Sequence, residues 1–105
     1  MATTAVQMYR GAASTTTTTT LYTVPNSSTQ SIITNIVVTN TTSTAQTFTL
    51  TFDGIDFATA ASIAGNGIAI FDLKQVLPAN ATPKTIKGGA SATTVNIQIS
   101  GVEVV

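Results

Sequence analysis

The chain has 105 residues, a formal net charge of zero, and only four basic and four acidic side chains. This length is typical of one domain, and four basic residues are too few for the positive surface of a nucleic-acid-binding protein. Cysteine and histidine are absent, which excludes disulfides, thiolate metal sites and the commonest catalytic base and nucleophile.

The amino-terminal residues 1–18 carry few large apolar side chains, and Val6, Met8 and Tyr9 are the largest. We therefore expect residues 1–18 to form an extended arm outside a β-sandwich domain of residues 19–105. This segment lacks the charged start and apolar run of a signal peptide, and no later apolar stretch is long enough to span a bilayer. We therefore expect synthesis in a cytoplasm, without secretion or membrane insertion.

Six consecutive threonines, residues 15–20, precede a short predicted strand at residues 21–24. A glycosylated stalk would usually contain many prolines, and none occurs before Pro25. Two other interpretations remain: a mobile terminus, or a segment that becomes ordered by adding a strand to a neighbouring subunit. Because threonine is β-branched and favours extended backbone, we favour the second.

Alternating apolar and polar side chains predict strands over 46–52 and 95–100. After residue 100, Gly101 interrupts the alternation, which predicts a β-bulge at that glycine. Residues 31–39 are apolar on both faces, with Ile32, Ile36 and Val38 on one of them. This pattern is typical of a central strand covered on both sides, or of one whose second face meets a neighbouring subunit.

The middle of the chain contains turn signals at 53–54 and 65–67 and a proline-flanked loop at 77–83. We expect one helical turn or a loop at 57–64 and a strand at 68–73. After the proline-flanked loop we expect a second strand at 84–87, ended by two glycines. Short strands at this spacing indicate an all-β fold. The sequence therefore predicts a single antiparallel β-sandwich, Ig-like or jelly-roll-like, with six to eight short strands.

Asp53 and Asp56 are close enough in sequence to act as paired acids on a sugar or to bind a cation. We interpret them instead as a turn residue and a loop residue. The segment Gly65–Gly67 lacks the third glycine of a dinucleotide-binding loop, and the lysines of 84–87 are typical of a solvated strand face. We expect no catalytic residue, no metal site, no cofactor and no enzymatic activity.

Three sequons for N-glycosylation begin at Asn26, Asn40 and Asn80. In a chain with 23 threonines such sequons arise by chance, and without a secretory signal they carry little functional meaning.

The order of four short motifs resembles that in small virion proteins of tailed bacteriophages. The motifs are LYTVP at Leu21–Pro25, IVVTN at Ile36–Asn40, TFTL at Thr47–Leu50 and VNI..SGVE at Val95–Glu103. The resemblance covers about residues 20–104 and its motifs are structural. It implies a bacteriophage capsid decoration or cement protein that binds the outer surface of the major capsid shell. The alternative is a tail or fibre component that binds host-surface glycan or a neighbouring tail protein.

The resemblance also implies two partners, the major capsid protein and further copies of the chain, with a trimer favoured, and no nucleic acid or membrane partner. The implied location is the capsid surface of the virion. The expected contacts are the turns at one end of the sandwich and arm residues Met8, Tyr9, Arg10, Thr15, Thr16, Thr17, Thr18, Thr19 and Thr20.

Overall fold

The computed structural model describes residues 2–105, which contain eight β-strands, their connecting loops and no helix. The strands are β1 (Thr3–Ala12), β2 (Thr20–Thr23), β3 (Gln30–Asn40), β4 (Gln46–Phe52), β5 (Ile55–Ile63), β6 (Ile68–Leu77), β7 (Thr85–Ala90) and β8 (Val95–Val104). Threonine, valine and isoleucine pack well on a pleated surface and account for this strand content. The all-β prediction is confirmed.

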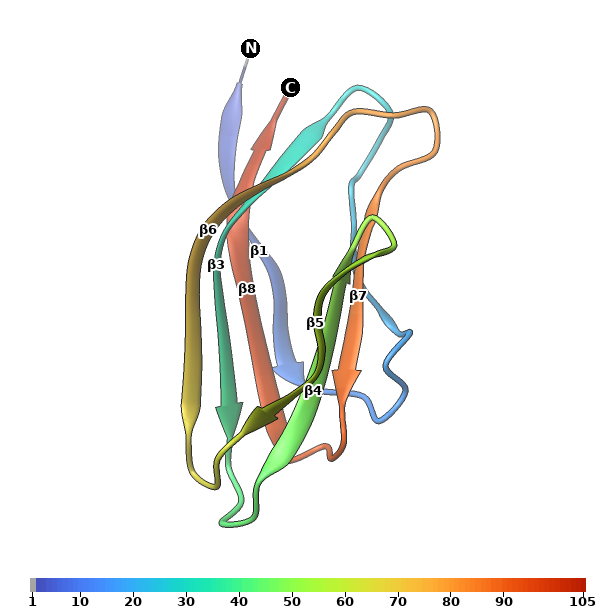
Figure 1. Ribbon diagram of the computed structural model, residues 1–105. Helices are drawn as coiled ribbons and strands as arrows, with labels where there is room; N and C mark the ends of the chain where they lie inside the picture. Colours follow the sequence, from blue (N-terminus) through green and yellow to red (C-terminus); the bar gives the residue numbers. More distant parts are fainter. Residues whose placement is uncertain (1) are drawn as a thin grey trace.

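The strands form two four-stranded antiparallel sheets that face each other (Figure 1). The first sheet has the order β1-β8-β3-β6, and the second has the order β2-β7-β4-β5. Consecutive strands therefore cross from one sheet to the other, except for the hairpin from β4 to β5. This order is that of a jelly roll, which consists of two Greek keys. The predicted sandwich is confirmed, and its jelly-roll form replaces the Ig-like alternative.

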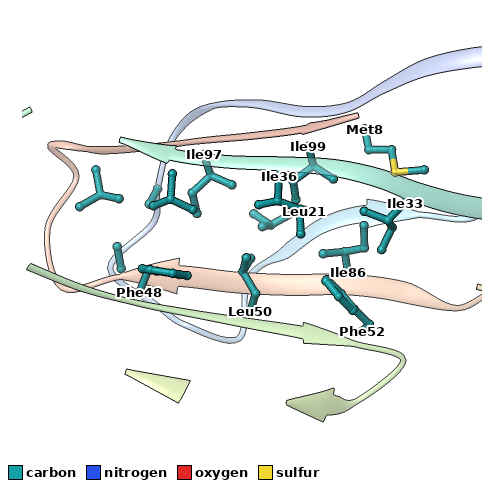
Figure 2. Close-up of a cluster of buried hydrophobic side chains, with 14 of the residues drawn as sticks. Met8, Leu21, Ile33, Ile36, Phe48, Leu50, Phe52, Ile86, Ile97 and Ile99 are labelled. Atoms are coloured by element: carbon teal, nitrogen blue, oxygen red, sulfur yellow. The ribbon is translucent and has the colours of Figure 1, made fainter. Parts of the chain in front are cut away.

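The core lies between the two sheets and is built from alternate residues of each strand (Figure 2). Phe48, Leu50 and Phe52 of β4 face Ile97 and Ile99 of β8, and all five are buried. Burying a side chain of this size contributes about 1.5–3 kcal/mol. The alternation predicted for 46–52 and 95–100 is therefore confirmed as the inner face of the sandwich.

Strand β3 contains a register shift between Ile33 and Asn35 against both of its neighbours. Against β8 the extra residue is Thr34 of β3, whereas against β6 the extra residue lies on β6. The bulge at Thr34 changes which β3 side chains face inward. Ile33, Ile36 and Val38 are buried, whereas Ile32 is half-buried on the outer side. The predicted grouping of Ile32 with Ile36 was wrong, because strict alternation cannot reveal a bulge within an apolar run.

Strand β8 runs regularly through Gly101, so the bulge predicted there was wrong. The irregularities lie on its neighbours, at Met8 of β1 and Thr34 of β3. Gly101 is buried, and a Cβ built on it would collide with the backbone oxygen of Ile32 and lie 2.6 Å from Met8 Cε. The apparent phase slip has another cause: Val102 and Val104 place apolar side chains on the outer face.

Residues 3–12 do not form an arm outside the sandwich. They form β1, which pairs with β8 from Thr3 opposite Val104 to Ala12 opposite Asn96. Main-chain hydrogen bonds to β8 need no hydrophobic side chains, so the polar composition of this segment concealed the strand. Met8 and Ala13, both buried, anchor it to the core.

Two further corrections concern the middle and late segments. Residues 55–63 form β5 in place of the expected helical turn or loop, with the positive φ of Ala60 (46°) marking an irregularity against β4. Gly88 and Gly89 lie inside β7 and do not end it. A Cβ on Gly88 would lie 2.8 Å from Leu50 Cδ2, so the absent side chain lets β7 lie against β4. The turns predicted at 53–54 and 65–67 are confirmed.

Candidate functional site

The threonine run forms a loop between β1 and β2 that is held against β7 of the same chain. Gly88 N donates to Thr19 O at 2.9 Å, and Ala90 N donates to Ser14 O at 2.8 Å. A Cβ on Gly89 would lie 2.7 Å from Thr16 O, so the loop backbone packs directly over that glycine. Thr15–Thr18 remain exposed. This part of the expected arm is thus ordered by its own chain and not by a neighbour.

The other expected contact residues differ in their availability to a partner. Met8 is 6% exposed and belongs to the core, so its side chain cannot contact a partner, which corrects that prediction. Tyr9 is half-buried and its hydroxyl donates to Ala12 O at 2.7 Å. Arg10 of β1 is exposed and lies opposite Gln98 of β8 in the strand register. Partner contacts by Tyr9, Arg10 and the threonines remain predictions.

An apolar row crosses the outer face of the β1-β8-β3-β6 sheet. Val76 of β6 pairs with Ile32 of β3, Ile32 pairs with Val102 of β8, and Val102 pairs with Ala5 of β1. Val76 is 51% exposed, and Ile32 and Val102 are half-buried without a second layer above them. We call this set the outer row. The two-sided apolar pattern of residues 31–39 had indicated an apolar outer face. The phase slip after Gly101, which places Val102 on that face, indicated it a second time.

Farther along the same face, Ile70 pairs with Val37 and Ile68 pairs with Thr39. Both isoleucines are 63% exposed. A polar row separates them from the outer row, with Asn35 donating through Nδ2 to Asp72 Oδ1 at 3.1 Å. Along β6 the outer face is therefore apolar at both ends and polar in the middle, whereas farther across the sheet Val37 is followed by Gln98 and Arg10.

An open groove of about 350 Å³ lies where the edge strands β5 and β6 of the two sheets approach each other. Its lining residues are Phe52, Asp53, Ile55, Asp56, Phe57, Gln75, Val76 and Leu77. Phe57 stacks on Phe52 with ring centroids 4.9 Å apart and meets Phe71 of the opposite sheet edge-on at 5.2 Å. The three rings close the core at the side of the sandwich, and two of them, Phe52 and Phe57, line the partly polar groove.

The two candidate acids both line this groove. Asp53 lies in the β4–β5 turn with φ of 53°, as expected, and its carboxylate forms an ion pair with Lys84 Nζ at 3.2 Å. Asp56 lies in β5 and not in a loop. Within residues 2–105 no group of three metal-ligating side chains comes together, and no helix has the length and hydrophobicity to cross a membrane.

The three sequon asparagines have structural environments that the sequence did not reveal. Asn40 is 1% exposed, and its amide nitrogen donates to Thr44 O, Ala64 O and Ile63 O at 2.8, 3.2 and 3.3 Å. It ties the β3–β4 loop to the β5–β6 turn and is inaccessible for modification. Asn26 and Asn80 are exposed and accept hydrogen bonds from backbone N–H groups two residues later.

Tyr22 connects the two sheets near the chain termini. Its hydroxyl donates to Glu103 Oε2 at 2.5 Å and lies 2.7 Å from Ser31 Oγ. Burial, followed by the hydrogen bond to the Glu103 carboxylate, raises the pKa of Tyr22 from 10.0 to about 12. The half-buried phenol therefore stays protonated at neutral pH and acts as a structural donor.

Neither the protein-family models nor the curated protein sequences give a match to this chain. Among solved structures, the chain is similar to one from the infectious bursal disease virus Gx strain, with a TM-score of 0.53 and 11% identity over 97% of this chain. It spans about a third of that longer chain, 32%. This similarity and the strand order agree on a jelly-roll fold.

Two more distant similarities have lower scores. One is to the virus-like particle of the extra small virus of the prawn Macrobrachium rosenbergii, with a TM-score of 0.47, 11% identity, and coverage of 98% of this chain and 80% of that one. The other is to the C-terminal domain of EclA, a sugar-binding protein, with a TM-score of 0.43, 14% identity, and coverage of 97% and 77%.

Proposed function

We propose that the chain is a structural protein of a virus particle, and more specifically a bacteriophage capsid decoration or cement protein. It would bind the outer surface of the major capsid shell and stabilise it after synthesis in the host cytoplasm. The observation that carries the proposal is the outer row, an apolar strip that crosses four strands of a jelly roll. The similarity to a chain of infectious bursal disease virus supports the more general part of the proposal, a structural role in a virus particle.

The outer row suits protein association for physical reasons. Its members are aliphatic and rigidly held by strand pairing, so burying them against a second protein costs little side-chain entropy. An exposed apolar strip edged by polar side chains is typical of an association surface. With eight charged residues in the whole chain, there is little charge to desolvate on docking.

The proposal includes no catalysis. A cement protein acts by bridging several coat subunits, so each added contact is effectively intramolecular once the first has formed. The paired aspartates of the groove are assigned no chemical role, since Asp53 is held in an ion pair by Lys84.

A particle-binding experiment tests this function. Purified chain is added to phage particles that lack it, and bound protein is counted after sedimentation of the particles. Val102→Lys places a charge in the centre of the outer row and should reduce binding by at least about tenfold. Thr59→Lys places the same charge on exposed β5 of the other sheet and should bind normally. Equal binding by both variants would contradict the use of this face.

The second candidate function is glycan binding by a tail or fibre component, and the groove between β5 and β6 is the observation that favours it. Sugars are recognised by apolar contact with aromatic rings and by hydrogen bonds to carboxylates and amides, and the groove offers Phe57, Asp56 and Gln75. A glycan array with the native chain and with Asp56→Asn tests it. Specific binding that the substitution abolishes would favour this function over capsid decoration.

A further inference from the structure

Strand β6 is an edge of its sheet, and within residues 2–105 its backbone pairs with β3 alone. Its other side therefore carries unpaired N–H and C=O groups along Ile68–Leu77. Figure 1 shows β6 as the outermost strand on one side of the sheet, with β1 as the edge strand on the other. An edge of ten residues can accept a strand from another molecule.

The other three edges carry features that discourage such pairing. β1 is interrupted by the bulge at Met8, β2 has only four residues, and β5 bends at Ala60 with two register shifts. Short, bulged or bent edges pair poorly with a new strand. β6 also has one irregularity, because its two residues Leu73 and Lys74 lie opposite the single Thr34 of β3. It contains neither proline nor glycine, and its exposed and less exposed side chains keep alternating from Ile68 to Lys74 across that point.

The side chains of β6 on the outer face are large, exposed and ordered in a particular way. Ile68, Ile70 and Val76 are three of the six exposed large hydrophobic residues found within residues 2–105. Between them lie two exposed charges, Asp72 and Lys74. A single unmatched charge on an edge strand opposes pairing, so any partner strand must match both.

A second copy of β6 matches this pattern. In an antiparallel pair centred on Leu73, Asp72 lies opposite the partner's Lys74, and Ile70 lies opposite the partner's Val76. The two-fold axis repeats both pairs, as required of an isologous contact. Centring the pair on Ile70 would instead place Asp72 opposite Ile68, leaving the charge against an apolar side chain. The order of charges therefore selects one register.

We infer that two copies of the chain associate through β6, joining their β1-β8-β3-β6 sheets into one continuous eight-stranded sheet. The contact combines main-chain hydrogen bonds, two opposite-charge pairs and two apolar pairs. It places the two outer rows on the same face of the joined sheet, each ending opposite the partner's Ile70. The biological role of this dimer rests on the proposed function, because a shell component must bind copies of itself. The pairing replaces the trimer expected from the resemblance with an even number of copies.

Charge reversal tests the register on the purified full chain. Sedimentation velocity at low salt should show a dimer, and Asp72→Lys or Lys74→Asp should each raise its dissociation constant by about tenfold or more, because like charges then face each other twice. The double variant with both substitutions restores opposite-charge pairs and should restore the dimer. Lys87→Asp on exposed β7 is the control and should leave it unchanged. Circular dichroism confirms that each variant is folded.

Three results would overturn the inference: a native chain that stays monomeric at every concentration, a native trimer, or a dimer that neither single reversal weakens. A double variant that stays dissociated would overturn the register. The particle-binding experiment is independent of these outcomes. A dimer that ignores particles would contradict the proposed function alone, and a monomer that binds particles would contradict the β6 pairing alone.

Discussion

Asn40→Asp should destabilise the chain severely at neutral pH and less so in acid. The native amide donates to three backbone carbonyls and accepts from Thr42 N and Thr42 Oγ1, both at 3.1 Å. A carboxylate at position 40 could still accept these two bonds, but it donates none. All three carbonyls would lose this donor, and the loss at buried Ile63 O costs about 1–3 kcal/mol. Thr44 O and Ala64 O would keep their bonds from Thr42 Oγ1 and Gly67 N.

The new negative charge adds to this loss, because it would face three carbonyl oxygens at a site that is 1% exposed. We expect a total loss of about 4 kcal/mol or more at neutral pH, a large share of the roughly 5–15 kcal/mol that stabilises a typical domain. Burial raises the pKa of the new carboxyl above its unfolded value of about 3.9. Stability is therefore greatest below that value and falls as pH rises through the folded-state pKa.

Urea unfolding of the native chain and the variant, at neutral and at acid pH, measures both effects. Asn26→Asp is the matched control. Asn26 also begins a sequon and accepts from Ser28 N and Thr29 Oγ1, but it is exposed and its hydrogen bonds all use Oδ1, which aspartate keeps. The control should stay within about 0.5 kcal/mol of the native chain. The reasoning is refuted if Asn40→Asp is equally mild, or if its deficit does not shrink in acid.

Three further predictions concern the edges of the core. Deleting residues 2–12 removes β1 and uncovers β8, so the truncated chain should lose its cooperative thermal transition; an unchanged melting temperature would support the external-arm interpretation. Gly101→Ala places a methyl group against the backbone oxygen of Ile32 as well as Met8 Cε, and should cost about 1–3 kcal/mol in urea unfolding. Gly54→Ala, in contrast, has open space and is disfavoured only by its φ of 76°. Because the pKa of Tyr22 is raised to about 12, the free energy of unfolding should fall as pH rises from 10 to 12. Tyr22→Phe should remove this part of the pH dependence. Ultraviolet absorbance of the phenolate records the titration.

The sequence was most informative where hydrophobic alternation is regular. The segments 46–52 and 95–100 predicted two core strands correctly, because one face of each is fully buried and the other is polar. The turns at 53–54 and 65–67 were equally clear, since aspartate, asparagine and glycine tolerate the positive φ found at Asp53, Gly54 and Asn66.

Prediction failed where backbone pairing, and not side-chain burial, determines the structure. The segment 3–12 is polar, yet it is a strand because its backbone forms main-chain hydrogen bonds with the edge of β8. The segment 57–64 resembled a loop because its alanines show weak periodicity, although β4 pairs with Ala58 and with Ala61–Ile63. The candidate site was only partly visible: the two-sided apolar pattern of β3 indicated an outer surface, but the expected contact Met8 is buried.

The sequence by itself determined the class of fold, since β-branched composition and period-two alternation are local properties that only sheets satisfy. It also determined the absence of histidine and cysteine chemistry. The tertiary structure decided which strands lie side by side, because pairing joins segments as distant as β1 and β8. It thereby decided that Val76, Ile32, Val102 and Ala5 form one row and that β6 has an open edge. Surfaces made by distant strands exist only after the chain has folded.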